Sequence, residues 1–325
     1  MRWNTYSSYL NKKYSKKLYR IGVDGGFSCP NRGKKGEGGC IYCDGSGSVA
    51  VYQRSEEKGF VLKKDLMKAR IDNIENQINR GLEFIKRRYK AEYASLYFQS
   101  FSNTFDTIDN LKKVYDRALS LYPFKELIVS TRPDLLSDEV CLLLSSYQNE
   151  NRDVWVEIGL QSGNDNTLER INRGHNTKCF IEAVNRVKSY GLKVTTHILL
   201  MPSYDDNKAL DDTIRIINET HCDGIKIHNI HITHNTELEK RYLNGGCFST
   251  ISYKRHIALL AYIIARLNED IIVFRLLTET PRARLVFPIE YPDKRDLIEE
   301  LEKYMEKNNL FQGSLLPSLR LGVNR

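Results

Sequence analysis

Short apolar, β-branched or aromatic runs alternate along the chain with longer segments in which apolar residues recur at helical spacing. The runs are expected to be strands, and they read YRIGV (19–23), ASLYFQS (94–100), ELIVST (126–131), VWVEIGLQ (154–161), KVTTHILL (193–200) and DGIKIHNIHI (223–232). Helical periodicity is found between them at 63–88, 107–121, 137–148, 177–190 and 206–219. Ser137 and Thr177 are expected to cap the helices that follow them.

From the second predicted strand onward, one strand and one helix repeat every 28 to 39 residues, which is the length of a βα unit. The pattern predicts a parallel α/β sheet, either an open (β/α)6 barrel or a doubly wound sheet. The final third differs, with a helix at 253–267, a strand at 271–277 and a charged helix at 293–309. We expect residues 1–240 to form the core, including its N-terminal segment, and residues 241–325 to form an extension packed on it.

Polar residues, prolines and glycines occur where the predicted strands end. These ends read QSFSN (99–103), STRPD (130–134), QSG (161–163) and MPS (201–203). In parallel α/β folds the carboxyl ends of the strands converge on one mouth, where binding and catalysis take place. The sequence therefore predicts one shared site at this edge of the sheet.

The chain of 325 residues carries a net charge of +8, and its basic residues cluster at 11–20, 31–36 and 85–90. A solvated basic surface would explain these clusters, and so would an anionic partner. Two of them flank the cysteine-rich stretch described below. Aromatic residues lie among them at Tyr14, Tyr19, Phe84 and Tyr89, as a surface that stacks nucleic-acid bases would require.

Composition points to a cytoplasmic protein. Mean hydropathy is −0.47, and the apolar run at 257–265 is too short to span a bilayer. The N-terminus has no apolar segment typical of a signal peptide. Seven unevenly spaced cysteines favour a reducing compartment over a disulfide framework.

Three of the cysteines, Cys29, Cys40 and Cys43, lie at C-x10-C-x2-C spacing in a glycine-rich loop after the first predicted strand. A closed zinc site needs four ligands, and the neighbouring sequence offers no histidine. A four-iron cluster held by three cysteines would keep its fourth iron open to another ligand. The residue types favour a cluster, while a zinc site and cysteines without a shared role stay open.

Further along the chain, several residues have two interpretations. Glu157 alternates with Gly159 and Gln161 on one face of a strand, so it is expected to point into the barrel. His197 on the fifth strand would, from sequence alone, be a hydrogen-bonded core histidine. Three histidines, His228, His231 and His234, are spaced so that neighbours fall on opposite faces of a strand, and no shared metal site is expected there.

The cysteine loop resembles the cluster loop of the radical S-adenosylmethionine (radical SAM) superfamily, and the chain as a whole is most similar to its YhcC/YtqA group. The long first gap also resembles the Elongator catalytic subunit. The motifs that carry the likeness run from Asn4 to Gly313 in the order NTYSSYL, DGGFSCPNRG, GGCIYCD, FQSFSNT, STRPD, EIGLQSGND, LERINRGH, GIKIHNIHI, RLLTETPR and FQG.

This resemblance implies a partial (β/α)6 TIM-like barrel with a C-terminal α/β extension. It implies that Cys29, Cys40 and Cys43 bind a [4Fe-4S] cluster whose fourth iron is chelated by S-adenosylmethionine. An electron from a donor such as flavodoxin or ferredoxin would then generate a 5′-deoxyadenosyl radical. No catalytic residue is assigned. The cofactor contacts implied by position are Gln99, Ser100, Ser130, Thr131, Arg132, Glu157, Gln161, Arg173 and His197.

Some of these positions depart from the superfamily pattern or have another explanation. The glycine-rich segment that contacts the cofactor amino group in relatives reads QSFSN (99–103) here, and the fifth strand ends in LLMPS (199–203). Arg173 matches an arginine suited to a carboxylate, but beside Gly174 it could equally cap the C-terminus of a helix.

The resemblance favours tRNA as the partner, with the side chain of the wobble uridine as the modified group. Lys34 and Lys35, between the cysteines, are expected to face such an anionic substrate. A zinc-stabilised protein that binds nucleic acid without catalysis is one alternative. A radical SAM enzyme that acts on a small molecule or a peptide is another.

Overall fold

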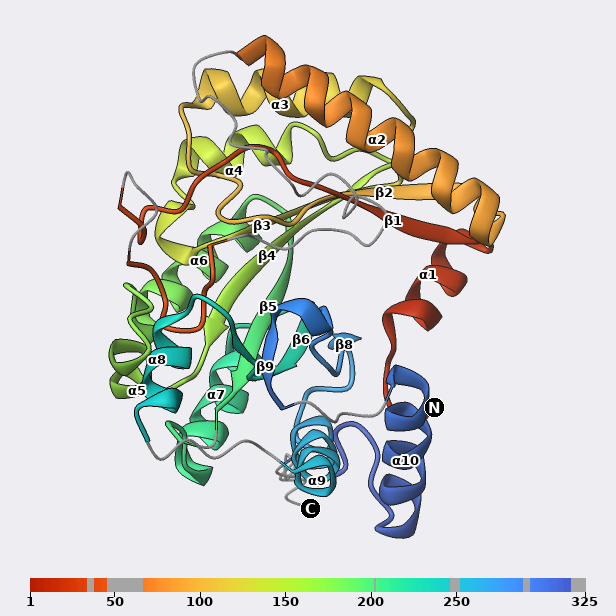
Figure 1. Ribbon diagram of the computed structural model, residues 1–325. Coiled ribbons are helices and arrows are strands. Elements are labelled where there is room, and N and C mark those ends of the chain that lie inside the picture. The colour runs from red at the N-terminus through yellow and green to blue at the C-terminus, as the bar shows by residue number, and fades with distance from the viewer. Residues whose placement is uncertain (34–37, 46–66, 202, 246–251, 289–292, 317–325) are drawn as a thin grey trace, which may run out of the picture.

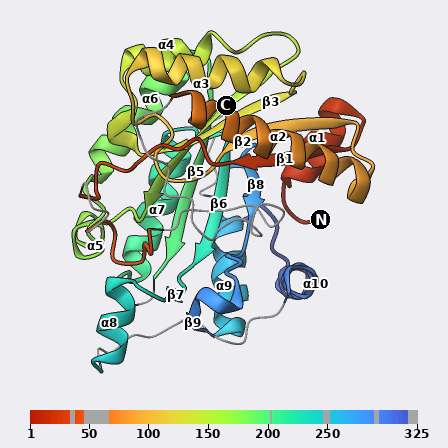
Figure 2. The same cartoon turned by 45° about the horizontal axis from the view of Figure 1, so that its top comes forward.

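A curled parallel sheet forms the centre of the computed structural model, which describes residues 1–33, 38–45, 67–201, 203–245, 252–288 and 293–316. The strands lie in the order β1-β2-β3-β4-β5-β6-β8. Their bounds are β1 Leu18–Val23, β2 Tyr93–Phe98, β3 Glu126–Thr131, β4 Asp153–Gln161, β5 Lys193–Leu200, β6 Gly224–Asn229 and β8 Ile272–Arg275. Because the order follows the chain without reversal, the sheet is an open half-barrel, and the doubly wound alternative is wrong (Figure 1 and Figure 2).

Helices cover the convex face of this sheet (Figure 1). The covering helices are α2 Met67–Tyr89, α3 Ile108–Ser120, α4 Asp138–Ser145, α6 Thr177–Ser189 and α7 Asn207–Glu219. Elsewhere lie α1 Tyr6–Tyr14, α5 Asp165–Arg170, α8 Glu237–Leu243, α9 Tyr253–Ile264 and α10 Lys294–Lys307. Two short strands, β7 Ile232–Thr233 and β9 Leu285–Phe287, pair antiparallel, and two 3-10 turns occupy Pro133–Leu135 and Arg282–Arg284.

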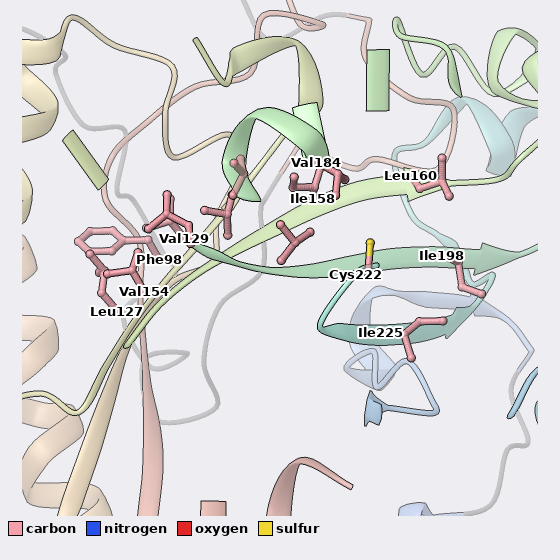
Figure 3. Close-up of a cluster of buried hydrophobic side chains, with 14 of the residues drawn as sticks. Phe98, Leu127, Val129, Val154, Ile158, Leu160, Val184, Ile198, Cys222 and Ile225 are labelled. Atoms are coloured by element: carbon pink, nitrogen blue, oxygen red, sulfur yellow. The ribbon is translucent and has the colours of Figure 1, made fainter. Parts of the chain in front are cut away.

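The strand residues alternate between an apolar outer face and a polar inner face. Phe98, Val129 and Ile158 point outward and pack with Val184 of α6 in the main hydrophobic core (Figure 3). The residue next to each of these along its own strand faces the inside of the half-barrel. There the side chains of Tyr97, Ser130 and Glu157 are linked by hydrogen bonds. The main core is therefore on the outer side; on the inner side, Ile128 and Trp155 belong to a second apolar cluster near the strand starts, and polar side chains collect nearer the strand ends.

Helix α1 closes the end of the half-barrel at which the strands begin. The Tyr6 hydroxyl donates a hydrogen bond to the buried Glu126 carboxylate, and the Tyr9 hydroxyl donates to Asp153 Oδ2 at 3.0 Å. Lys13 also forms an ion pair with Asp153. Since this end is filled, ligands have access at the opposite end, where the strands finish.

The predicted segments between 93 and 219 match the observed ones to within a few residues. Ser137 caps α4 as expected, accepting from Val140 N at 3.3 Å. Thr177 does not cap α6: Asn176 accepts from Cys179 N at 2.9 Å, and Thr177 is the first helical residue. Because an asparagine side chain accepts from the same backbone position as threonine, the two could be told apart only by the backbone path.

The C-terminal segment is more closely joined to the sheet than a packed extension would require. The strand expected at 271–277 is β8, and it pairs in parallel with β6 as the last strand of the half-barrel. The division at residue 240 stays a prediction. Within the described ranges, none of the helices is both long enough and apolar enough to cross a membrane.

Candidate active site

A cavity of about 410 Å³ opens where the strands of the half-barrel end. It is lined by the cysteine loop, by the ends of β2 to β6 and by residues that follow β8. The predicted site residues on its wall are Cys29, Cys40, Cys43, Gln99, Ser130, Thr131, Arg132, Glu157, Gln161, Arg173 and His197. Of the predicted contacts, Ser100 is fully buried and is absent from this lining. The sheet thus brings together residues that span 169 positions of the chain, from 29 to 197.

The cysteine loop is held against the segment that follows α5. The Ile41 amide donates to the Ile171 carbonyl at 3.0 Å, and the Asn172 side chain donates to the Gly39 carbonyl at 2.7 Å. Within the loop, the Cys43 amide donates to the Cys40 carbonyl at 2.9 Å. These bonds give the C-x2-C portion a defined backbone path beside the ends of β4 and β5.

Positively charged groups surround the thiols. Arg173 Nη1 lies 3.6 Å from Cys40 Sγ, and Arg32 Nη1 lies 3.4 Å from Cys43 Sγ. Burial by itself would raise the pKa of Cys40, but the charge and hydrogen bond of Arg173 outweigh it, so that the pKa is lowered. Burial raises the pKa of Cys43, opposed in part by Arg32. The neighbouring guanidinium groups suit a site that takes thiolate ligands.

Three thiols on the wall of one cavity are the donor set that a three-cysteine iron–sulfur cluster needs. Two buried nitrogen atoms on the same wall, Arg173 Nε and His228 Nε2, have no hydrogen-bond partner among the described residues. Buried polar atoms without partners are rare in folded proteins, so they indicate that a polar ligand belongs here. In the described parts of the chain, no group of three His, Cys, Asp or Glu side chains is gathered for one metal ion.

Glu157 is at the centre of a polar cluster inside the half-barrel. Glu157 is 1% exposed, and its side chain forms an ion pair with Lys226 of β6. Glu157 Oε2 also accepts from Ser130 Oγ at 2.8 Å and lies 3.1 Å from His197 Nε2. Burial opposes ionisation, but Lys226 and His197 together hold the pKa of this carboxyl well below its usual value. The expectation that Glu157 points into the barrel is confirmed.

Arg132 and Arg173 have different hydrogen-bond partners, which indicates different roles. Arg132 donates to the Arg173 and Gly174 carbonyls at 2.7 and 3.1 Å and pairs with Asp134, so its guanidinium supports the 173–174 segment. Arg173 Nη2 donates to the Gly159 carbonyl of β4 at 3.2 Å. The Arg173 backbone amide also donates to the Leu168 carbonyl of α5 at 2.9 Å, so the helix-capping alternative holds for its backbone while its guanidinium lines the cavity.

The histidines occupy separate environments. His197 is the hydrogen-bonded core residue expected from sequence and also lines the cavity. His228 stacks on it with ring centroids 5.4 Å apart, whereas His231 lies 2.9 Å from Thr280 and His234 pairs with Glu239. The predicted role of Lys34 and Lys35 lies outside the described residues.

Sequence reasoning did not predict several residues of the cavity wall, among them Tyr97, Lys226, His228 and Arg275. Lys226 could have been found, because a lysine inside the apolar strand GIKIHNIHI faces the barrel by simple alternation. Tyr97 gave no signal, since tyrosine is an ordinary strand residue.

Two family models match the chain. The Radical SAM superfamily model covers residues 29–216, and the Radical_SAM C-terminal domain model covers residues 222–307. The first includes all three cysteines of the cavity and the strands β2 to β5.

Individual relatives agree with this. Protein YhcC of Escherichia coli (strain K12) is 30% identical over 96% of this chain and 95% of its own length. The tRNA uridine(34) acetyltransferase of Methanocaldococcus infernus is 28% identical over 57% of this chain and 34% of its own length. Among solved structures, the archaeal Elp3 of Methanocaldococcus infernus with an N-terminal deletion superposes with a TM-score of 0.63 at 20% identity. That match covers 74% of this chain and 60% of the Elp3 chain.

Proposed function

Because the chain belongs to the radical SAM superfamily, whose members use a [4Fe-4S] cluster and S-adenosylmethionine, we propose that Cys29, Cys40 and Cys43 hold such a cluster. We further propose that the cavity of about 410 Å³ binds S-adenosylmethionine. The observation that carries the proposal is that three thiols and two unpartnered polar nitrogens line one cavity. When bound and supplied with an electron by a donor such as flavodoxin or ferredoxin, these cofactors supply a 5′-deoxyadenosyl radical that takes hydrogen from a substrate.

The surrounding side chains would bind and orient the cofactor. Arg173 is buried beside Cys40 with Nε unused, so its charge can meet the carboxylate of S-adenosylmethionine. Gln161 ends β4 in a left-handed conformation, with φ of 72°, and lines the cavity. Glu157 and His197, further inside, offer hydrogen-bonding groups for a ribose or for the substrate.

Substitution of Gly159 by alanine tests this arrangement. A Cβ at this position would lie 2.5 Å from Arg173 Nη2 and 2.5 Å from Gln161 Nε2. Both atoms end flexible side chains, so the fold should persist while the two side chains are displaced from the cofactor. We expect an affinity for S-adenosylmethionine about tenfold lower, because a charged hydrogen bond is lost.

Equilibrium dialysis with the anaerobically reconstituted protein measures this affinity, and a thermal melt serves as the folding control. An unchanged affinity in a folded Gly159→Ala protein would remove Arg173 and Gln161 from the cofactor site.

For the substrate, we favour tRNA and, within it, the side chain of the wobble uridine. The support comes from the likeness to tRNA uridine(34) acetyltransferase, whose name specifies that nucleotide. The net charge of +8 and the basic clusters suit a polyanionic partner. The relative shares only part of its length with this chain, so the likeness supports the class of substrate and does not extend to acetyl transfer.

Two measurements test the proposed function in order. Anaerobically reconstituted protein with S-adenosylmethionine and a reductant should form 5′-deoxyadenosine, and a colourless protein that forms none would contradict the core proposal. Mass spectrometry of tRNA nucleosides from a strain that lacks the gene should then show an altered wobble uridine. Unaltered wobble nucleosides would overturn the tRNA proposal alone and favour a small-molecule or peptide substrate.

A further inference from the structure

A second cavity of about 690 Å³ lies at the open side of the half-barrel, between the edge strands β1 and β8. Helices α1 and α10 lie on the same side of the molecule as this opening (Figure 1), and residues of both line it. We call it the lateral groove. Arg275 and Glu279 line both the lateral groove and the active-site cavity, so the two spaces meet at these residues.

The wall of the groove is strongly cationic. Its charged lining residues are Lys17, Arg20, Arg275, Lys294 and Glu279, that is, four cations and one carboxylate. Its aromatic lining residues include Trp3, Tyr19, Phe84 and Tyr89. Tyr19 and Tyr89 stack in parallel with ring centroids 4.3 Å apart. A groove of this kind has the charge to attract an anion and flat apolar surfaces for the rest of a ligand.

Arg20 of β1 is held in place by aromatic rings. Its guanidinium carbon lies 4.4 Å from the centre of the Tyr6 ring and 5.3 Å from that of Phe274. Within the described ranges its charge interacts with the buried Glu157 and Glu126 carboxylates, but no hydrogen bond or ion pair joins it to a side chain. Cation–π contacts position the guanidinium but leave its five N–H donors available. A half-buried arginine in this state is prepared for an anionic ligand.

Arg275 reaches the groove through an irregularity in β8. The register with β6 shifts by one residue, so that Val273 pairs with Ile225 while Arg275, and not Phe274, pairs with Lys226. Such a bulge re-aims a side chain, and both Phe274 and Arg275 line the groove. Within the described ranges the exposed Arg275 side chain also has no ion-pair or hydrogen-bond partner.

Burial disfavours the charge of Arg20, but neighbouring groups that include Glu157 and Glu126 raise its pKa, so the interior beside these arginines holds charges of both signs. Glu157 is already engaged with Lys226 and His197. Burial lowers the pKa of Lys226 to about 7, and the charges of Arg20 and Arg275 add to that decrease, while Glu157 opposes it. Both arginines are therefore close enough to act on the same lysine. An anion bound in the groove that both arginines line would reduce the repulsion among these cations.

We infer that the lateral groove is a second ligand site, in which Arg20 and Arg275 bind an oxyanion of the substrate, either a nucleotide phosphate or a carboxylate, while the aromatic wall receives the adjoining part of that substrate. Guanidinium groups bind phosphate and carboxylate in the same bidentate manner, so the two share one site chemistry. The site's position at the junction of the cavities lets a bound substrate extend toward the cofactor. The inference goes beyond the proposed function and does not depend on tRNA being the substrate.

Isothermal titration calorimetry with the reconstituted full chain tests the site. Saturating S-adenosylmethionine is present, so that its own carboxylate is not the anion measured. The probes are uridine 5′-monophosphate, uridine and succinate. Arg275→Gln should lower the affinity for at least one of the two anions, uridine 5′-monophosphate or succinate, by about tenfold to hundredfold, since a charge-assisted bidentate contact is lost. Uridine, which lacks the anion, should be unaffected.

Lys113→Gln is the matched control, because Lys113 is an exposed lysine on α3, away from the groove, and the substitution removes the same charge. Arg20→Gln should cause a similar loss of anion affinity. If the Arg20→Gln protein does not fold, the Arg275→Gln protein still tests the site. If the affinity for the nucleotide alone decreases, the group bound in the groove is a phosphate. If the affinity for succinate alone decreases, it is a carboxylate.

Three outcomes would overturn the inference. One is that neither anion binds the unaltered protein at concentrations on the order of 10 mM. Another is that Arg275→Gln and Lys113→Gln give the same affinities. The third is that Arg275→Gln changes only the affinity for S-adenosylmethionine, which would make Arg275 a cofactor contact.

Discussion

Cys40→Ala is expected to retain less than about one tenth of the iron bound by the unaltered chain after anaerobic reconstitution, because a cluster held by three thiolates cannot be kept by two. Formation of 5′-deoxyadenosine should be lost with it. Cys40 is the natural choice among the three, since its side chain is buried and Arg173 lies 3.6 Å from its sulfur. Iron analysis and the visible absorbance spectrum measure the result.

Cys179→Ala serves as the matched control. Cys179 is a partly buried thiol on α6 and is absent from the residues that line the cavity. It should keep the full iron content and activity. Equal iron in the two variants would show that Cys40 is no cluster ligand, and a circular dichroism spectrum would exclude general unfolding as the cause of a loss.

Glu157→Gln is expected to lower the free energy of unfolding by about 3–5 kcal/mol, the usual cost of removing one member of a buried ion pair. The amide would leave Lys226, which is 1% exposed, beside Arg20 and Arg275 without a counter-charge. It would also weaken the contacts with Ser130 and His197. Urea denaturation of the full chain, followed by circular dichroism, measures the change.

A double variant separates the charge effect from a simple packing defect. Glu157→Gln combined with Lys226→Met removes both charges and keeps the volume of the lysine stem, so most of the lost stability should return. If Glu157→Gln costs less than about 1 kcal/mol, or if the double variant is less stable by the sum of the two single changes, the ion pair is not the source of the effect.

The pKa of Glu157 also sets how this contribution depends on pH. The folded chain holds the pKa of the carboxyl well below its ordinary value. Because the unfolded chain then binds the proton more readily than the folded one, the stabilisation is present above the ordinary carboxyl range and decreases as the pH falls through and below it. Glu157→Gln should therefore reduce the loss of stability on acidification.

Much of the fold could be predicted from the sequence because its signals are local. The strands at Glu126–Thr131 and Lys193–Leu200 have the predicted bounds, since continuous β-branched runs between helices of 3.6-residue periodicity leave little choice. Helix α1 was missed because its sequence, YSSYLNKKY, has few apolar residues and is stabilised by contacts to distant Glu126 and Asp153. Such contacts have no local pattern.

The sequence by itself determined which residues carry the proposed chemistry. Cysteine spacing, polar strand ends and the family motifs led to the three cysteines and to eight residues that do line the cavity. Ser100 was predicted because it belongs to the segment QSFSN (99–103) that aligns with the cofactor-contacting segment of relatives, but it is fully buried and absent from the cavity lining. The alternation of side chains along a strand predicts which of two neighbouring residues faces the inside of the barrel. It gives no such prediction for Gln99 and Ser100, because β2 ends at Phe98.

Only the tertiary structure decided how these residues act on one another. The parallel register of β4, β5 and β6 places Glu157, His197 and Lys226 in contact. A shift in the register of β8 turns Arg275 toward the open side of the barrel. Charge and burial act through distance in space. Strand pairing sets that distance for Glu157 and His197, which lie 40 positions apart, whereas the curl of the sheet brings its two edge strands, and with them Arg20 and Arg275, to one groove across 255 positions of the chain.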